Sequence, residues 1–357
     1  MKKILALVLV LALALSFVAC GTPASSAPAS QPASQPASEP ASEPAVTGGL
    51  KTGMGIVAGG AVKGEASEDA EGSVQSNSTV AVVTVGADGK IVDCKIDVAQ
   101  TSTKFGTDGT VEDAAKVDVR SKMEKGPDYG MLKASPIGKE WNDQANAFAA
   151  FVVGKTADEV TAIAQLGEDA HNGPADADLA AGCTMDITDM KAAVAAAVAN
   201  AKEMGANAGD TLGLGVVTGV TAVSATADGD GKIQHDTTFS VVTKAADGKI
   251  TSSFLNVTQT KYAVTAEGVA ECKTATVTPK YELGADYKMK DASPIGKEWF
   301  EQADAFNAYI IGKTGAEVEA LAQLGADAHN GPADADLAAG CTMDVTDMKA
   351  ATVKAAA

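Results

Sequence analysis

Two pairs of β-branched runs, in which apolar and polar residues alternate, predict an antiparallel hairpin in each half of the chain. An Ala-Asp-Gly tripeptide separates the runs of each pair, and Asp-Gly is a strong signal for a tight turn between strands. Further short strands are expected at residues 116–120 and 274–278. The runs are residues 79–85 and 90–98 around Ala87-Asp88-Gly89, and residues 239–243 and 249–257 around Ala246-Asp247-Gly248.

After each hairpin the apolar spacing becomes helical. Ser135 suits an N-cap, and Pro136 suits the first helical position because its missing N–H costs nothing there. Ile137, Trp141, Phe148 and Val152 then recur on one helical face. Gly154, and Gly312 in the second half, are expected to close the helices.

Two shorter helical signals follow in each half. Thr156 with Glu159, and Thr314 with Glu317, form the Thr-x-x-Glu pattern of a capping box. A last helix is expected from about residue 189, with Met190, Val194 and Val198 on its buried stripe.

One stretch is repeated letter for letter. The sixteen residues His171–Asp186 return unchanged as His329–Asp344. Together with the paired hairpins and helices, this predicts an α+β fold of two tandem repeats, each a small twisted, mainly antiparallel sheet with about three helices. We expect the repeats to cover residues 49–206 and 207–357.

The first 48 residues have a different character. Lys2 and Lys3 precede an apolar run at 4–18, too short for an ordinary membrane-spanning helix, so residues 1–20 are expected to be a signal peptide. The sequence ending at Cys20-Gly21 resembles a bacterial lipobox, which implies lipid attachment to Cys20. Residues 21–48, rich in Pro, Ala and Ser, are expected to form a disordered stalk.

Composition narrows the function. The formal net charge is −18, so few positive charges are available to neutralise phosphates, and this argues against nucleic-acid binding. Cys183 and Cys341 correspond in the two copies, whereas Cys94 and Cys272 have no counterparts. This distribution does not indicate a disulfide framework, and the absence of Cys-x-x-Cys argues against a zinc ribbon.

The repeated stretch carries the most specific motif. Asp178-Leu-Ala-Ala-Gly182-Cys183-Thr184 resembles the Asp-x-x-Ser/Thr-Gly-Ala-Thr/Ser signature of the FMN-binding domain family, which includes flavin subunits of membrane NADH:quinone and Rnf-type reductases. The resemblance implies that a flavin transferase links FMN to Thr184 and to Thr342, with Asp336, Gly340 and Cys341 completing the second motif. This sequence departs from the signature at Ala181 and Ala339, at both cysteines, and at Asp186 and Asp344.

Several neighbouring residues have alternative interpretations. Trp141, Trp299, Tyr129 and Tyr287 could stack on a flavin ring, although the spacing of the tryptophans favours helix-face core. Lys139 and Lys297 could meet a phosphate or simply be solvated. Val153-Gly-Lys-Thr156 lacks the first glycine of a phosphate-binding loop. A metal site at His171, or a calcium site at Asp176 and Asp178, has little support in the spacing.

The expected function is therefore a membrane-anchored, extracytoplasmic FMN-binding protein with up to one flavin per repeat. It would be an electron carrier more than an enzyme with its own substrate, so no catalytic or metal-binding residues are expected. Its partners would be the membrane, reached through the lipid, a flavin transferase and redox proteins. The alternative is a flavin-free surface lipoprotein acting as a binding or structural module.

Overall fold

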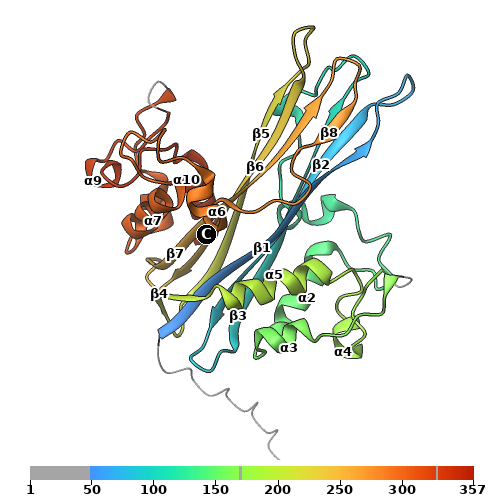
Figure 1. The fold of residues 1–357 in the computed structure, drawn as a ribbon. Helices are drawn as coiled ribbons and strands as arrows, with labels where there is room; N and C mark the ends of the chain where they lie inside the picture. Colours follow the sequence, from blue (N-terminus) through green and yellow to red (C-terminus); the bar gives the residue numbers. More distant parts are fainter. Residues whose placement is uncertain (1–48, 169–170, 327–328) are drawn as a thin grey trace, which may run out of the picture. The chain divides into compact units, whose positions relative to one another are not determined.

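Each half of the chain folds its long hairpins into one four-stranded antiparallel sheet (Figure 1). The computed structural model describes residues 49–168, 171–326 and 329–357, so the predicted signal peptide, lipidated Cys20 and stalk lie outside the described residues. We call residues 49–206 the N-terminal half and residues 207–357 the C-terminal half. The strand order is β3-β2-β1-β4 in the first sheet and β5-β6-β7-β8 in the second. The strands are β1 (Gly49–Gly64), β2 (Gly72–Val85), β3 (Ile91–Phe105), β4 (Lys202–Asn207), β5 (Thr211–Val223), β6 (Gly231–Lys244), β7 (Ile250–Val264) and β8 (Ala270–Cys272).

Five α-helices accompany each sheet among the described residues, several of them a single turn, so the α+β class is confirmed. The helices of the N-terminal half are α1 (Lys122–Lys125), α2 (Trp141–Val152), α3 (Ala157–Thr161), α4 (Ala177–Ala180) and α5 (Thr188–Ala199). Those of the C-terminal half are α6 (Lys280–Leu283), α7 (Trp299–Ile310), α8 (Gly315–Glu319), α9 (Ala335–Ala338) and α10 (Thr346–Ala356). No helix of the described residues has the length and apolarity needed to cross a bilayer.

The sheets pack on each other, and the two groups of helices cover the outer faces (Figure 1). Met54, Val80 and Val82 of the first sheet meet Phe239 and Val241 of the second in one apolar cluster. Helix α5 packs on β1 and β2, and helix α10 packs on β5 and β6. Strand β2 is consequently buried on both faces from residue 78 to residue 85. The strands β2 and β6 extend beyond the apolar runs that predict them because their earlier residues also pair with a strand on each side.

Glycines on the first strand of each sheet allow the last helix to approach closely. A Cβ added at Gly55 would lie 2.1 Å from the carbonyl oxygen of Ala193 on α5. A Cβ added at Gly215 would lie 1.8 Å from the carbonyl oxygen of Ala351 on α10. The Gly-x-Gly pairs at 53–55 and 213–215 are therefore packing positions, where the helix backbone rests on the strand.

Some local predictions are confirmed and others are wrong. The capping boxes at Thr156 and Thr314 are both present. The helix predicted to begin near Ser135 begins instead at Trp141, because Gly138 has φ of 61° and interrupts the helical path. The strands predicted at 116–120 and 274–278 do not form. The first range contains the end of a 3-10 turn capped by Asp113, and the second makes one isolated bridge, between Thr276 and Gly59.

The seam between the sheets contains a buried histidine. His235 of β6 is 1% exposed, and its Nδ1 and Nε2 lie 2.8 Å and 2.9 Å from the hydroxyls of Ser76 and Thr103. Burial lowers the pKa of His235 to about 4, although the charge of Asp236 opposes the change. The imidazole is therefore neutral in the folded state at pH 7.

This histidine is expected to make stability fall in acid. Between pH about 6.5 and about 4 the unfolded chain binds a proton at His235 that the folded chain does not, so unfolding becomes easier as pH falls. The difference corresponds to about 3 kcal/mol over that window. Urea unfolding at pH 7 and pH 4 should show this loss in the wild type and little of it in His235→Gln. His171→Gln, at an exposed position, should retain the wild-type loss; an equal loss in His235→Gln would contradict the assignment.

Candidate functional site

The predicted acceptor threonines follow the short helices α4 and α9 and are each held by a buried glutamine. The Thr184 amide donates to Gln144 Oε1 at 2.8 Å, and the Thr184 hydroxyl lies 3.3 Å from the same oxygen. Thr342 meets Gln302 Oε1 with distances of 2.8 Å and 3.4 Å. Both threonines are half-buried, and both glutamines are fully buried. The hydroxyls thus lie at a polar anchor between the loop and helix α2 or α7.

Each anchoring glutamine is itself fixed by the turn before its helix. Gln144 Nε2 donates to Ser135 Oγ and to the Lys139 carbonyl, both at 3.1 Å. Gln302 Nε2 donates to Ser293 Oγ at 3.0 Å and to the Lys297 carbonyl at 3.2 Å. The repeated Ala-Ser-Pro-Ile-Gly-Lys-Glu-Trp sequence therefore forms a turn that holds the glutamine, and the serine does not cap the helix.

The glycines and cysteines of the motif serve packing. A Cβ on Gly182 would lie 2.8 Å from Ala147 Cβ of α2, and one on Gly340 would lie 2.7 Å from Ala305 Cβ of α7. Cys183 and Cys341 are fully buried in the two helix-covered cores. Burial raises the pKa of each thiol to about 11, so both stay protonated at neutral pH. The close approach at each glycine is made by a helix.

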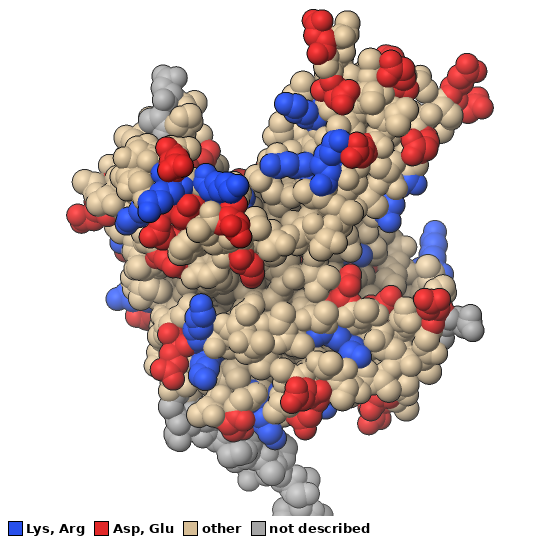
Figure 2. All heavy atoms as spheres, in the orientation of Figure 1, with Lys and Arg blue, Asp and Glu red and all other residues tan. Residues whose placement is uncertain are grey.

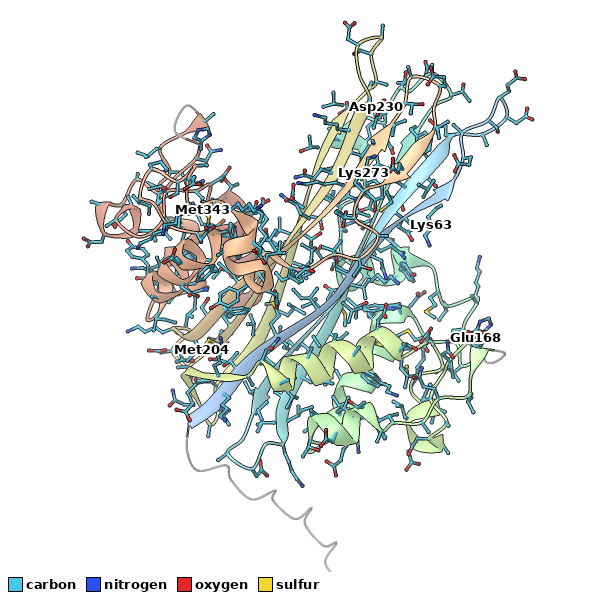
Figure 3. All side chains as sticks on the ribbon, viewed as in Figure 1. Lys63, Glu168, Met204, Asp230, Lys273 and Met343 are labelled. Atoms are coloured by element: carbon cyan, nitrogen blue, oxygen red, sulfur yellow. The ribbon has the colours of Figure 1, made fainter. Side chains whose placement is uncertain are left out.

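The motif aspartates and nearby lysines lie at the surface. Asp178 and Asp336 are exposed in the first turn of α4 and α9, where the cap residues are Asp176 and Asp334. Lys139 Nζ lies 3.4 Å from the Ala181 carbonyl oxygen, so a cation is placed beside the first motif. Met343, next to Thr342, lies among the helices of the C-terminal half (Figure 3).

A cleft of similar size and composition opens in each half. The first encloses about 350 Å³ and the second about 370 Å³. Ten residues of the first correspond in order to ten of the second, and the second adds Gln259. The first cleft is lined by Asn77, Thr79, Val98, Lys122, Trp141, Asn172, Asp186, Thr188, Asp189 and Met190. The second is lined by Asp236, Thr238, Val257, Gln259, Lys280, Trp299, Asn330, Asp344, Thr346, Asp347 and Met348.

Each cleft adjoins the threonine anchor through two elements. Asp186 and Thr188 line the first cleft and follow Thr184 by two and four residues. On helix α2, Trp141 lines the cleft, and Gln144, three residues later, holds Thr184. Residues three apart share a helix face and are separated by about 4.5 Å along its axis. Neither Thr184 nor Thr342 lines a cleft itself; each is joined to its cleft only through these two elements.

Both clefts contain a buried oxygen without a partner. Asn77 Oδ1 and Asp236 Oδ1 occupy corresponding positions, opposite Gln100 and Gln259 in the strand register, and neither forms a hydrogen bond within the described protein. Leaving a buried acceptor unsatisfied costs about 1–3 kcal/mol. Each oxygen can therefore accept a hydrogen bond from a donor that enters its cleft.

A lysine and a tryptophan line each cleft, and the same lysine lies over a tyrosine that does not line it. Lys122 Nζ lies 4.7 Å from the Tyr129 ring centroid and 5.4 Å from that of Trp141. Lys280 Nζ lies 4.8 Å from Tyr287 and 5.7 Å from Trp299. Each tryptophan is 5% exposed, so it is part of the core, as its spacing predicts, and also part of the cleft wall.

Each cleft is also lined by acidic residues, Asp186 and Asp189 in the first and Asp236, Asp344 and Asp347 in the second. Burial and the charge of Asp186 raise the pKa of Asp189, while Lys122 opposes the change. Burial raises the pKa of Asp347, with further contributions from Asp344 and Asp236. Across residues 49–168, 171–326 and 329–357, no group of three His, Cys, Asp or Glu side chains is arranged to hold a metal ion.

An asparagine in an unusual backbone conformation closes the rim. Asn172 and Asn330 have φ of 49° and 50°, in the left-handed region that few residues other than glycine adopt. Their side-chain amides point to Asp186 and Asp344, at 3.5 Å and 3.2 Å. The exposed His171 shares this conformation and does not line the cleft.

Sequence reasoning located only part of this site. Asn172 and Asp186 lie in the repeated stretch, and Trp141 lies in the repeated octapeptide, so repetition pointed to them. No sequence signal indicates Asn77 and Lys122, because they lie on β2 and α1, which come close to the repeated stretch only when the chain is folded. Comparisons with protein-family models, curated proteins and solved structures each found no match.

Proposed function

We propose that the chain is a tandem duplication in which each half holds one flavin mononucleotide, and that it carries electrons outside the cytoplasmic membrane. The observation that carries this proposal is the matched pair of clefts, built from corresponding residues. Each cleft is connected to a threonine of the flavin-type motif by the loop that follows the threonine and by the helix whose glutamine holds it. Volumes of about 350 and 370 Å³ fall within the range of small-molecule sites, near its lower end.

The residues of the cleft fit a planar heteroaromatic ring. Trp141 and Trp299, each 5% exposed, present a small part of an aromatic ring to the cleft. The unpartnered Asn77 Oδ1 and Asp236 Oδ1 can accept a hydrogen bond from a ring N–H. A flavin ring carries one such N–H between two carbonyl groups. Binding would thus satisfy an acceptor that is otherwise buried at a cost.

The threonines are suited to a phosphate ester. The Thr184 amide already satisfies Gln144 Oε1 at 2.8 Å, so loss of the longer hydroxyl contact leaves the glutamine paired. Lys139, beside the Ala181 carbonyl, can offset the charge of a bound phosphate. In the second half the charge of Lys297 acts on Cys341, next to Thr342. Asp178, Asp336 and the buried cysteines have no direct role in this arrangement.

The protein would position the flavin and tune its charge. When bound, a flavin supplies reversible one- or two-electron chemistry. Lys122 and Lys280 favour negative charge at the aromatic wall, whereas Asp189 and Asp347 disfavour it. The net effect of these groups sets how readily the site accepts electrons.

The remaining parts of the proposal concern location. Lipid attachment at Cys20 would hold the protein on the outer face of the membrane, and residues 21–48 would act as a spacer. A flavin transferase would load the threonines, and separate redox proteins would donate and accept the electrons. The anchor can be tested independently of the flavin: the Cys20→Ala variant should be released from the membrane.

Flavin binding can be tested one cleft at a time. The chain has two tryptophans, one in each cleft, so Trp141→Phe leaves only Trp299 emitting and Trp299→Phe leaves only Trp141. Riboflavin absorbs where tryptophan emits and should quench both variants in a saturable manner. Saturable quenching of neither tryptophan would contradict the proposal.

A second candidate rests on the acidity of the clefts. Asp186, Asp189 and their counterparts suit a cationic ligand, as expected for a flavin-free binding module. The diamine putrescine, titrated in the same two variants, separates the candidates. A response to putrescine without a response to riboflavin would favour the binding module.

A further inference from the structure

The cleft of the C-terminal half continues into a second cavity. This cavity, which we call the side lobe, encloses about 390 Å³. It shares Gln259 and Lys280 with the cleft, so the two spaces adjoin. The side lobe is lined by Gln259, Lys261, Thr274, Thr276, Val277, Thr278, Lys280, Leu283, Asp286 and Tyr287.

The connector at this place is longer in the N-terminal half. There, Asp118-Val119-Arg120 lies between the buried Val117 and Ser121, the cap of α1. In the C-terminal half only Thr278 lies between the buried Val277 and Pro279, the cap of α6. The longer connector carries the single arginine of the chain.

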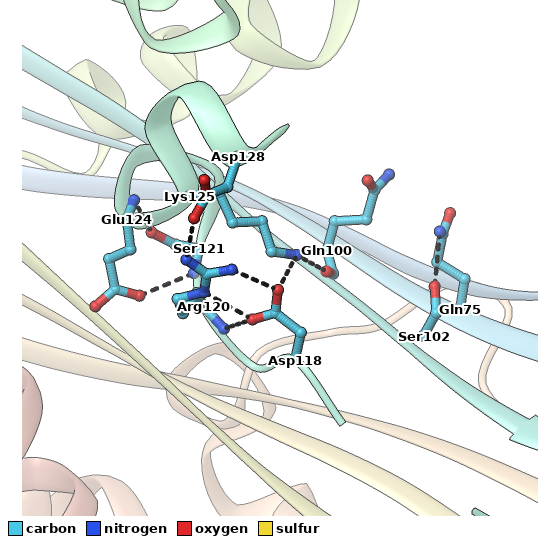
Figure 4. Close-up of polar contacts among 9 residues, drawn as sticks. All are labelled: Gln75, Gln100, Ser102, Asp118, Arg120, Ser121, Glu124, Lys125 and Asp128. Carbon is cyan, nitrogen blue, oxygen red and sulfur yellow. Dashed lines mark hydrogen bonds and ion pairs between the residues drawn. The ribbon is translucent and has the colours of Figure 1, made fainter. Parts of the chain in front are cut away.

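Ion pairs hold that longer connector against its own half (Figure 4). Arg120 bonds to Asp118 at 3.0 Å and to Asp128 at 2.8 Å. Lys125 Nζ lies 3.9 Å from Asp118 and 3.5 Å from the Gln100 carbonyl oxygen. Gln100, Lys125 and Asp128 correspond to Gln259, Leu283 and Asp286 of the side lobe. The connector and its partners therefore stand where the C-terminal half has the cavity.

The side lobe also has a different charge from the cleft. Lys261 and Lys280 contribute two ammonium groups, Thr274, Thr276 and Thr278 contribute hydroxyls, and Asp286 is the one carboxylate of the lining. Neither lysine forms an ion pair with any residue that the structure describes. At the position of Lys261 the N-terminal half has Ser102, which bonds to Gln75 at 2.9 Å (Figure 4).

We propose that the side lobe is a phosphate-binding site that exists only in the C-terminal half, with Lys261 and Lys280 as its cationic contacts. Ammonium groups and hydroxyls pair well with phosphate oxygens. The phosphate would belong either to a separate phosphorylated molecule or to a ligand bound non-covalently in the adjoining cleft, since the phosphate of FMN esterified to Thr342 would lie outside the side lobe. The proposal goes beyond flavin binding and does not require it.

Trp299 provides the readout, because Lys280 lies 5.7 Å from its ring. In the Trp141→Phe chain, inorganic pyrophosphate should change Trp299 emission in a saturable manner. In the Trp299→Phe chain, Trp141 emission should not respond. Adding Lys261→Gln to Trp141→Phe should weaken pyrophosphate binding about tenfold, as expected for loss of one charge-assisted contact. Lys273→Gln, a neighbouring lysine that pairs with Glu271 and does not line the lobe, should leave binding unchanged (Figure 3).

Flavins distinguish the two sources of phosphate. If the phosphate belongs to the ligand of the cleft, Trp299 emission should report a higher affinity for FMN than for riboflavin, and pyrophosphate should remove this difference in affinity. If it belongs to a separate molecule, pyrophosphate should bind without affecting either flavin. The proposal is overturned if Trp299 does not respond to pyrophosphate, or if Trp141 responds equally. Neither result changes the quenching of Trp141 or Trp299 by riboflavin, so flavin binding is tested independently of the phosphate site.

Discussion

Replacing Gly55 or Gly215 by alanine is expected to destabilise the protein severely. The added Cβ would lie 2.1 Å from the Ala193 carbonyl oxygen in the first case and 1.8 Å from the Ala351 carbonyl oxygen in the second. These atoms belong to helix backbones, which cannot turn aside as a side chain can. Overpacking usually costs 1–3 kcal/mol, and we expect about 3 kcal/mol or more here because the whole helix must shift.

Urea unfolding followed by circular dichroism measures this loss. Gly229→Ala is the matched control, since a Cβ there has no atom within 4 Å. The control should keep the wild-type midpoint, while each packing variant should lose a large part of its stability. An unchanged midpoint in Gly55→Ala and Gly215→Ala would mean that α5 and α10 do not rest on the strands as described.

Replacing both acceptor threonines by valine is expected to abolish covalent flavin. In cells that also express a flavin transferase, Thr184→Val and Thr342→Val should each remove one FMN from the exported chain, and the double variant should carry none. Valine has nearly the shape of threonine, and its backbone N–H can still donate a hydrogen bond to Gln144 or Gln302, so the fold should persist. Fluorescence of the band on a denaturing gel reports the bound flavin.

The control for this experiment is Thr161→Val. The Thr161 hydroxyl bonds to the Ala157 carbonyl on α3 at 2.9 Å, and Thr161 does not line either cleft. This variant should fluoresce as brightly as the wild type. A double variant that remains fluorescent after denaturation would show that the flavin is attached elsewhere.

Local signals predicted the elements well, because they depend on neighbouring residues. Asp-Gly turns between alternating runs marked the hairpins, and Thr-x-x-Glu marked the starts of α3 and α8. The contacts between the sheets could not be predicted in this way. Residues 72–78 of β2 include one apolar side chain, Val74, and give no strand signal, yet Ser76 and Ser78 are buried and bond to His235 and Thr258 of the other sheet.

The candidate site was predicted less completely than the fold. The repeated stretch led to Thr184 and to the cleft residues Asn172 and Asp186, which it contains. The motif did not reveal that Gly182 accommodates helix α2 or that Cys183 lies in the core, because both depend on how α2 packs. Lys122 was missed since it lies about sixty residues upstream in the chain.

The sequence also shows the acidic character of the chain. Exposed acidic residues dominate the ends of the β1–β2 and β5–β6 hairpins, including Glu68, Asp69, Asp228 and Asp230 (Figure 2). The local excess of lysine in the side lobe is hidden in the composition, since it depends on bringing Lys261 and Lys280 together.

The number of flavins on the wild-type chain tests the account most directly. Intact-mass analysis of the exported protein, produced together with a flavin transferase, should show a gain of two FMN per chain, one for each half. No mass gain, together with no quenching of Trp141 or Trp299 by riboflavin, would contradict the flavin assignment.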